Sequence, residues 1–343
     1  MNYQYKNLIY FQNGSIGDFL MTIFFLENIY LNNRDLNLFV VVPKNYEFLS
    51  HIAKEYPYLN IILANRKSTR GLAGVFKLGK FIFSKNLVIT APTPGKLSFY
   101  IKIMAKKISF FKKSQLVGFE DGQKINKFIY SRLLKYNTKI IYSDFLKVII
   151  EELGFEVKKE LPELRYSKDK NILLELGLEE KRYIVFNPLA ATKGRSFKLE
   201  EISEIIDFLK ICTPEIKIVL TGGGADGEIL NLFKRGSFVL VNLEVSKLCT
   251  LLDNSKLFIG VDTGTSHVAS FLGVKSLVVA QNGTPNWLPY YNKNATILYK
   301  IKNCQHNIFE GRDHLEDCRS DVLRCLGYVD LNIIKNYLGK LLK

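Results

Sequence analysis

The chain has 343 residues, of which 47% are hydrophobic, 24% are charged and only nine are proline. This length is typical of two compact domains, and this composition excludes disordered, collagen-like and low-complexity proteins. The sequence shows no internal repeat of about 20–50 residues, which excludes solenoids and propellers. The N-terminus lacks the pattern of a signal peptide, and apolar runs such as LFVVV at 38–42 are too short to span a membrane, so we expect a cytoplasmic protein.

The net charge of +15 is concentrated in the first half of the chain. Residues 1–165 contain 25 Lys and Arg against 13 Asp and Glu, whereas the remainder contains 23 against 20. Residues 56–119 contain twelve basic residues and no acidic one. Solvated faces of a Lys-rich protein would give this pattern, and so would a surface that binds nucleic acid, a phosphorylated lipid or a sugar phosphate. No nucleic-acid-binding motif accompanies the charge, so we expect no nucleic-acid partner.

Short apolar runs that end in Gly, Asn or Pro alternate with segments of helical periodicity, which is typical of parallel α/β architecture. The pattern is clear in both halves of the chain. The predicted strands are 6–12, 36–42, 61–64, 87–90, 182–188, 216–223, 256–262 and 275–281, and the predicted helices are 18–31, 196–210, 245–255 and 266–273.

A charged, Pro-interrupted segment near 160–178 separates the two halves and is the predicted linker. We therefore expect an N-terminal domain over 1–165 and a C-terminal domain over 166–328. Each should contain a doubly wound parallel sheet that binds its ligands at the carboxyl ends of the strands.

The first candidate site is the Gly-rich turn NGSIGD, which lies between a predicted strand and a predicted helix. Gly14 and Gly17 allow a tight turn and a close approach of a ligand to the backbone. Asp18 falls at the start of the helix, where a carboxylate can cap free N–H groups. A carboxylate at a strand end is also suited to act as a general base. The turn alone leaves both roles open.

The second candidate site follows the strand at 182–188. Thr192, Lys193 and Arg195 precede a predicted helix, which is typical of an anion site, although a solvated basic loop has the same composition. A third turn, TGGGAD, ends in Asp226. This residue either contacts ribose hydroxyls or caps the next helix.

The motif DTGTSH gives the strongest signal. Asp262 ends an apolar strand, and Thr263 and Gly264 form a turn before a predicted helix. The N-terminus of a helix binds diphosphates through its free N–H groups and the positive end of its dipole. His267 could donate a hydrogen bond to such a phosphate, although a lone histidine at this position is more often structural.

Five motifs together resemble those of glycosyltransferase family 9, the heptosyltransferases of lipopolysaccharide core assembly. The family pattern has an early turn ending in Gly-Asp, an NPGA-like strand end followed by a basic residue, a glycine pair, an Asp-Thr-Gly-x-x-His motif, and a Gly-Pro-Thr loop with Trp-x-Pro-Tyr. The similar segments of this chain, in the same order, are NGSIGD, NPLAATKGRSF, TGGGAD, DTGTSH and NGTPNWLPY.

The resemblance implies an α/β GT-B fold, in which two Rossmann-like domains face each other across a cleft, and a terminal helix in 329–343 that crosses back to the first domain. It implies that Asp18 is the catalytic base and that Gly14 and Gly17 form the loop beside the acceptor. The implied donor-binding residues are Thr192, Lys193, Arg195, Asp226, Asp262, Thr263, Gly264 and His267.

The implied reaction is an inverting transfer from a nucleotide-sugar donor, with ADP-heptose as the first candidate, to an anionic, lipid-linked saccharide of a lipopolysaccharide or lipooligosaccharide core. The resemblance also implies peripheral contact with the cytoplasmic face of the inner membrane. We expect no cofactor and no metal, because the chain contains no D-x-D pair to hold one against the diphosphate. The first alternative is another GT-B transferase or a sugar epimerase that uses a UDP-sugar, since either would share the nucleotide-binding half. The second, which rests on charge alone, is a basic nucleic-acid-binding protein.

The five cysteines are an odd number at low density, so we expect reduced thiols. Cys304, Cys318 and Cys325 lie near two histidines in the C-terminal tail. Their spacing is not the paired C-x2-C arrangement of a structural zinc site. We therefore expect no zinc in this tail.

Overall fold

The computed structural model divides into two compact units. Unit 1 comprises Met1–Thr138 and Ser143–Arg165, and unit 2 comprises Lys139–Tyr142 and Tyr166–Lys343. The structure describes residues 5–12, 16–43, 48–64, 81, 83–92, 99–109, 114–120, 123–135, 140–161, 163–169, 171–234, 237–281, 285–300, 309–310 and 327–343.

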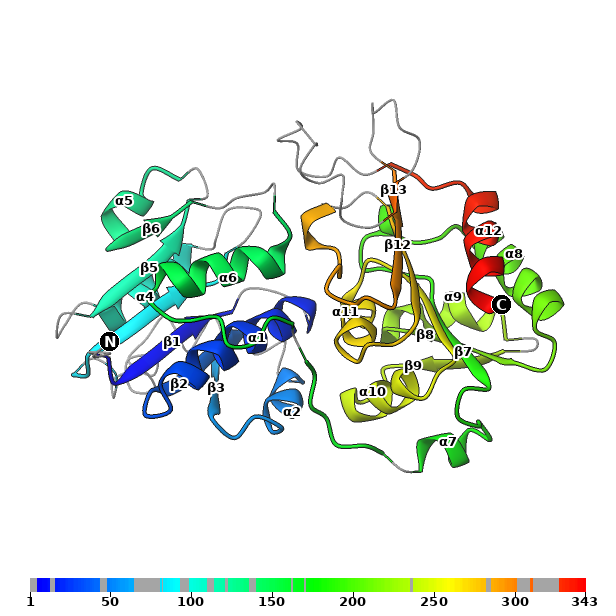
Figure 1. Ribbon diagram of the computed structural model, residues 1–343, viewed down its shortest axis with the longest axis horizontal. Helices are drawn as coiled ribbons and strands as arrows, with labels where there is room; N and C mark the ends of the chain where they lie inside the picture. Colours follow the sequence, from blue (N-terminus) through cyan, green and yellow to red (C-terminus); the bar gives the residue numbers. More distant parts are fainter. Residues whose placement is uncertain are drawn as a thin grey trace. The chain divides into compact units, whose positions relative to one another are not determined.

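Unit 1 is built on a six-stranded parallel sheet with the strand order β3-β2-β1-β4-β5-β6 (Figure 1). The chain runs outward through β2 and β3 and then returns to place β4 on the other side of β1. The order of the strands therefore reverses between β1 and β4, and this switch point is where doubly wound sheets bind ligands. The strands are β1 (Asn7–Phe11), β2 (Asn37–Pro43), β3 (Leu59–Ala64), β4 (Asn86–Thr90), β5 (Gln115–Phe119) and β6 (Arg132–Leu134).

Helices cover both faces of the unit 1 sheet. On one face the ring of Tyr10 lies 5.6 Å from that of Phe25 in α1, and on the other face Ile9 and Phe11 pack with Ala105 of α4. Because β1 is buried on both faces, its sequence is a continuous apolar run. The helices of unit 1 are α1 (Ile16–Asn32), α2 (Leu49–Ala53), α4 (Phe99–Ser109), α5 (Asn126–Ile129) and α6 (Tyr142–Glu152).

Unit 2 contains a seven-stranded sheet with the order β13-β12-β11-β10-β7-β8-β9. All its pairs are parallel except that β13 runs antiparallel to β12. After β9 the chain returns to place β10 beside β7, so the switch point of this sheet lies between β7 and β10. The strands are β7 (Tyr183–Asn187), β8 (Lys217–Gly222), β9 (Phe238–Val241), β10 (Leu257–Val261), β11 (Ser276–Ala280), β12 (Ala295–Tyr299) and β13 (Phe309–Glu310).

The C-terminal helix α12 packs within unit 2, beside α8 (Figure 1). Ile334 and Leu338 are fully buried in the core that α8 helps to form, and Lys335 makes an ion pair with Glu204 at 2.6 Å. The apolar face of this helix is therefore buried in unit 2. That the helix crosses back to the first domain, as the resemblance implies, stays a prediction. The helices of unit 2 are α7 (Ile172–Glu175), α8 (Leu199–Cys212), α9 (Gly227–Asn231), α10 (Val245–Asp253), α11 (Gly264–Phe271) and α12 (Leu331–Leu342).

The predicted α/β class and the two doubly wound sheets are confirmed. Each predicted strand and helix is present, with ends that shift by a few residues. The helix predicted at 266–273, for example, begins two residues earlier. None of the helices in the described ranges is long and apolar enough to cross a membrane.

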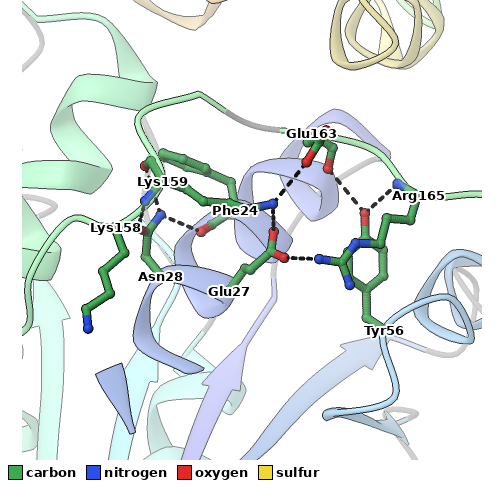
Figure 2. A network of polar contacts seen from close by, with 8 residues as sticks. All are labelled: Phe24, Glu27, Asn28, Tyr56, Lys158, Lys159, Glu163 and Arg165. Atoms are coloured by element: carbon green, nitrogen blue, oxygen red, sulfur yellow. Dashed lines mark hydrogen bonds and ion pairs between the residues drawn. The ribbon is translucent and has the colours of Figure 1, made fainter. Parts of the chain in front are cut away.

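The segment before Tyr166 is held on unit 1 by backbone hydrogen bonds to side chains (Figure 2). Asn28 of α1 accepts hydrogen bonds on Oδ1 from the backbone N–H groups of Lys158 and Lys159, at 2.8 and 2.7 Å. The hydroxyl of Tyr56 accepts from the backbone N–H of Arg165 at 2.9 Å and donates to the carbonyl of Glu163 at 3.2 Å. The residues just before Tyr166, including the start of the predicted linker, are therefore part of the fold of unit 1.

Glu27 of α1 carries a buried charge at the centre of this network (Figure 2). Its side chain is only 4% exposed, and its carboxylate lies 3.1 Å from Nζ of Lys159 and 2.6 Å from Nη2 of Arg165. The Arg165 guanidinium also lies over the ring of Tyr56, 5.4 Å from its centre. Two cations from the segment thus compensate a carboxylate that has left water.

Candidate functional site

Several of the predicted donor residues of unit 2 lie together at the carboxyl ends of β7 and β10. Thr263 follows β10, and its hydroxyl donates to Oδ1 of Asn187, the last residue of β7, at 3.1 Å. The Asn187 amide donates in turn to the carbonyl of Thr221 in β8 at 2.7 Å. Asn187 therefore ties three strand ends together at the switch point. Sequence reasoning missed it, although a polar residue that ends a fully buried strand is a recognisable signal.

The N-terminus of α11 lies at this switch point. The helix begins at Gly264, with Thr263 as its N-cap residue. The backbone N–H of Thr263 donates to the Ser266 hydroxyl at 3.1 Å, and that hydroxyl donates to the Thr263 carbonyl at 2.7 Å. The first N–H groups of an α-helix have no acceptor within the helix, and they carry the positive end of its dipole. This end of α11 is suited to bind an anion.

Asp262 lies between two other predicted donor residues. Its Oδ2 accepts a hydrogen bond from Nη1 of Arg195 at 2.9 Å, and its Oδ1 lies 3.8 Å from Nε2 of His267. The Asp262 side chain is 9% exposed, whereas that of Arg195 is 34% exposed. The ion pair fixes a guanidinium that has five N–H donors, so Arg195 keeps donors for a phosphate.

His267 and Tyr291 form a second buried contact, and both side chains are neutral at pH 7. Burial lowers the pKa of His267, and Asp262 opposes this shift while Arg195 adds to it. His267 Nδ1 lies 2.9 Å from the hydroxyl of Tyr291. Burial, together with the charge of Asp262, raises the pKa of Tyr291 well above its ordinary value. The site thus holds an uncharged imidazole beside a charged Arg–Asp pair.

We expect His267 to make the stability of the protein depend on pH below about 6.5. A base whose pKa is lower in the folded state binds fewer protons there, so its contribution is present above the unfolded pKa of about 6.5 and is lost as the pH falls below it. His267→Gln should flatten the dependence of melting temperature on pH between about 7 and 5.5. Parallel profiles for the wild type and the variant would contradict the lowered pKa.

The other predicted donor residues are less enclosed. Thr192 and Lys193 are exposed at the 3-10 turn η2 (Lys193–Arg195). Asp226 is half-buried and accepts a hydrogen bond from the backbone N–H of Gly223 at 2.7 Å. Asp226 therefore stabilises the turn that contains it, which is similar to the capping role that the sequence leaves open. A Cβ at Gly222 would lie 2.8 Å from Oδ2 and 2.9 Å from Cβ of Asp226, so a larger residue there would displace the Asp226 side chain.

In unit 1, Asp18 lies in the first turn of α1, directly after the switch-point strand β1. The helix begins at Ile16, so Asp18 is its third residue and does not occupy the N-cap position. Its side chain is half-buried, and its carbonyl accepts a hydrogen bond from the Thr22 hydroxyl at 2.9 Å. Gly17 is buried in the same turn, whereas Gly14 lies outside the described residues.

Not every basic residue of the acid-free stretch at 56–119 lies on the surface. Lys102 of α4 is fully buried, donates to Oδ1 of Asn126 and lies 6.0 Å from the centre of the Tyr130 ring. This lysine is therefore part of the interior of unit 1. Many other basic residues of the stretch lie outside the described residues.

Across the described parts of the chain, no group of three or more His, Cys, Asp or Glu is placed to hold a metal ion. Cys212 is exposed, and burial raises the pKa of the Cys249 thiol to about 12. Cys304, Cys318 and Cys325 lie outside the described residues, so the expectation about zinc stays a prediction.

The sequence matches one protein family over most of the chain. The sequence profile of glycosyltransferase family 9 (heptosyltransferase) matches residues 75–316. Comparison with curated protein sequences found no match.

Many solved structures have a similar fold, including the following three. The glycosyl transferase family 9 protein from Veillonella parvula DSM 2008 is 16% identical, with a TM-score of 0.76 over 100% of this chain and 98% of that chain. The E. coli ADP-heptose LPS heptosyltransferase II is 14% identical, with a TM-score of 0.69 over 98% of each chain. The E. coli heptosyltransferase WaaC, with ADP-2-deoxy-2-fluoro heptose, is 17% identical, with a TM-score of 0.66 over 97% of this chain and 99% of that chain.

Proposed function

The chain belongs to glycosyltransferase family 9, the heptosyltransferases, and we propose on this basis that it transfers heptose from ADP-heptose to a saccharide of a lipopolysaccharide or lipooligosaccharide core. The observation that carries the proposal is the Arg195–Asp262–His267 cluster at the start of α11. A fixed guanidinium and a helix N-terminus together match the charge of a donor diphosphate. Similar proteins solved with ADP and with an ADP-heptose analogue support ADP as the nucleotide.

In the proposed reaction, Asp18 accepts the proton of an acceptor hydroxyl as that oxygen attacks the anomeric carbon of the donor sugar. The bond from this carbon to the diphosphate oxygen breaks on the opposite side, so the configuration inverts and a nucleoside diphosphate leaves. Arg195 and the N-terminus of α11 stabilise the negative charge that develops on the leaving group. His267, as an uncharged imidazole, supplies a further hydrogen bond.

We propose an anionic, lipid-linked acceptor and peripheral contact with the cytoplasmic face of the inner membrane. The excess of basic residues in 1–165 supports both, since phosphate and carboxylate groups on the acceptor and anionic lipid headgroups would be attracted to it. The buried Lys102 is not part of that attraction.

The donor is tested by calorimetry with ADP and UDP, followed by a transfer assay with ADP-heptose. We expect ADP to bind and UDP to bind more weakly. Preferential binding of UDP would favour another GT-B transferase or a sugar epimerase, and would contradict ADP-heptose as the donor.

Arg195→Ala should weaken ADP binding by about tenfold or more, because hydrogen bonds to a charged group contribute roughly 1.5–3 kcal/mol. Arg182→Ala is a matched control, since Arg182 is an exposed arginine of the same unit that pairs with Glu179. Calorimetry on both variants measures the difference. Equal affinities for ADP in the two variants would remove Arg195 from the proposed site.

We further propose that protein cations, and not a metal, neutralise the diphosphate. Lys193, Arg195 and the N-terminus of α11 would supply the positive charge. Treatment with EDTA should then leave the transfer rate unchanged. A strict requirement for Mg²⁺ or Mn²⁺ would contradict this part of the mechanism.

A further inference from the structure

Tyr291 makes a buried contact with His267 that the proposed mechanism does not yet use. It follows the 3-10 turn η4 (Pro285–Trp287), and its hydroxyl lies 2.9 Å from His267 Nδ1. Both residues are buried, with 9% of Tyr291 and 8% of His267 exposed. The ring of Tyr291 packs edge-on against Phe271, with ring centres 4.9 Å apart. Phe271 lies four residues after His267 on α11, so one face of this helix holds both the imidazole and the tyrosine ring.

Two proton arrangements are possible between His267 and the Tyr291 hydroxyl. At neutral pH each partner keeps one proton, because burial lowers the pKa of His267 and raises that of Tyr291. In the first arrangement the hydroxyl donates to Nδ1, and the imidazole proton lies on Nε2. In the second arrangement Nδ1–H donates to the hydroxyl oxygen, and Nε2 carries only a lone pair.

The surroundings of Nε2 favour the first arrangement. Nε2 lies 3.8 Å from Oδ1 of Asp262, so a lone pair there would face a carboxylate oxygen, whereas an N–H would be attracted to it. The second arrangement also requires another acceptor for the hydroxyl proton. Within the part of the chain that the structure describes, Nδ1 of His267 is the only hydrogen-bond partner of the Tyr291 hydroxyl. A buried donor without an acceptor is costly.

We infer that Tyr291 is a positioning residue, whose hydroxyl donates to Nδ1 of His267 and holds this histidine in the tautomer that carries its proton on Nε2. The consequence for catalysis rests on the proposed function. The Nε2–H would then be the group of His267 that donates to an oxygen of the donor diphosphate. Asp262 and Arg195 are the charged groups that act on His267, and neither can replace the bond to Nδ1.

Nitrogen-15 NMR of histidine-labelled protein without ligand tests the tautomer directly. The chain has four histidines, and the signals of His267 are those missing from His267→Gln. In the wild type we expect Nε2 to be protonated and Nδ1 to be an unprotonated acceptor. A wild type with the proton on Nδ1 would overturn the inference without any variant of Tyr291.

Tyr291→Phe removes the hydroxyl and keeps the ring against Phe271. We expect the Nδ1 signal of His267 to move toward that of a ring nitrogen without a hydrogen bond, and the affinity for ADP to fall about threefold to tenfold, which is the range for one hydrogen bond. Tyr183→Phe is the matched control, because Tyr183 is a fully buried tyrosine of unit 2 whose hydroxyl donates to the Leu251 carbonyl. It should reduce stability without changing the Nδ1 signal of His267 or the affinity for ADP.

The results separate this inference from the proposed function. An unchanged Nδ1 signal of His267 in Tyr291→Phe, or an equal effect of Tyr183→Phe on ADP affinity, would overturn the positioning role. Failure of the wild type to bind ADP would contradict the proposed donor, while the tautomer would still report on the bond between Tyr291 and His267.

Discussion

Asp18→Asn is expected to lower turnover by about a hundredfold or more, because asparagine keeps the shape of aspartate but cannot accept a proton from the acceptor hydroxyl. Stability should change little. Asp18 is in the first turn of α1, where loss of a negative charge costs only about 0.3–1 kcal/mol through the helix dipole. Initial rates, melting temperature and the affinity for ADP, measured on the same preparation, separate these effects.

The matched control for this variant is Asp144→Asn. Asp144 is the third residue of α6, as Asp18 is of α1, so the substitution removes a first-turn carboxylate from the same unit. We expect a small loss of stability and a normal rate. Full activity in Asp18→Asn, or an equal loss of rate in both variants, would be incompatible with Asp18 as the base.

The second large effect is expected in the network around Glu27. Replacement of both Lys159 and Arg165 by alanine leaves a carboxylate that is 4% exposed without either of its cations. Breaking a fully buried ion pair costs about 3–5 kcal/mol, and we expect a smaller loss here because the Arg165 and Lys159 side chains are 48% and 24% exposed. Urea denaturation of the full chain measures the loss, which should appear in the transition of unit 1.

A third substitution distinguishes charge from packing. Adding Glu27→Gln to the double variant removes the buried charge, so we expect part of the lost stability to return. Lys147 and Glu160 provide a surface comparison, since Glu160 is 74% exposed and its removal should cost no more than about 1 kcal/mol. If the triple variant were no more stable than the double variant, the loss would come from packing against Tyr56 and not from the buried carboxylate.

The fold was largely predictable because parallel strands covered by helices on both sides leave long apolar runs in the sequence. The strands β1, β7, β10 and β11 are buried at every position and were all predicted. Strands β5, β6, β9, β12 and β13 were missed. Strand β6, for example, is only three residues long and begins with an arginine, so no periodicity marks it.

The sequence predicted which residues gather in this region but not which of them contact each other. Strand ends in a parallel sheet meet at one edge, which is why Asp262 and Arg195 could be placed in the same region from their motifs. Their pairing with each other, across 67 residues, could not be derived from local spacing. The same holds for Asn187 with Thr263, across 76 residues. These contacts depend on strand order, and motif spacing carries no information about it.

The anchoring of Lys159 and Arg165 on α1 has a consequence for folding during synthesis. Glu27 is made early, but its bond to Arg165 joins residues 138 positions apart. Until that segment has left the ribosome, the carboxylate has neither cation and is better solvated than buried. Chains fold as they emerge, so we expect the core around α1 to close late, when production of the next unit is about to begin. The segment that carries Lys159 and Arg165 is therefore the last part of unit 1 to join the fold. A fragment that ends before this segment would lack the two cations that compensate Glu27 in α1.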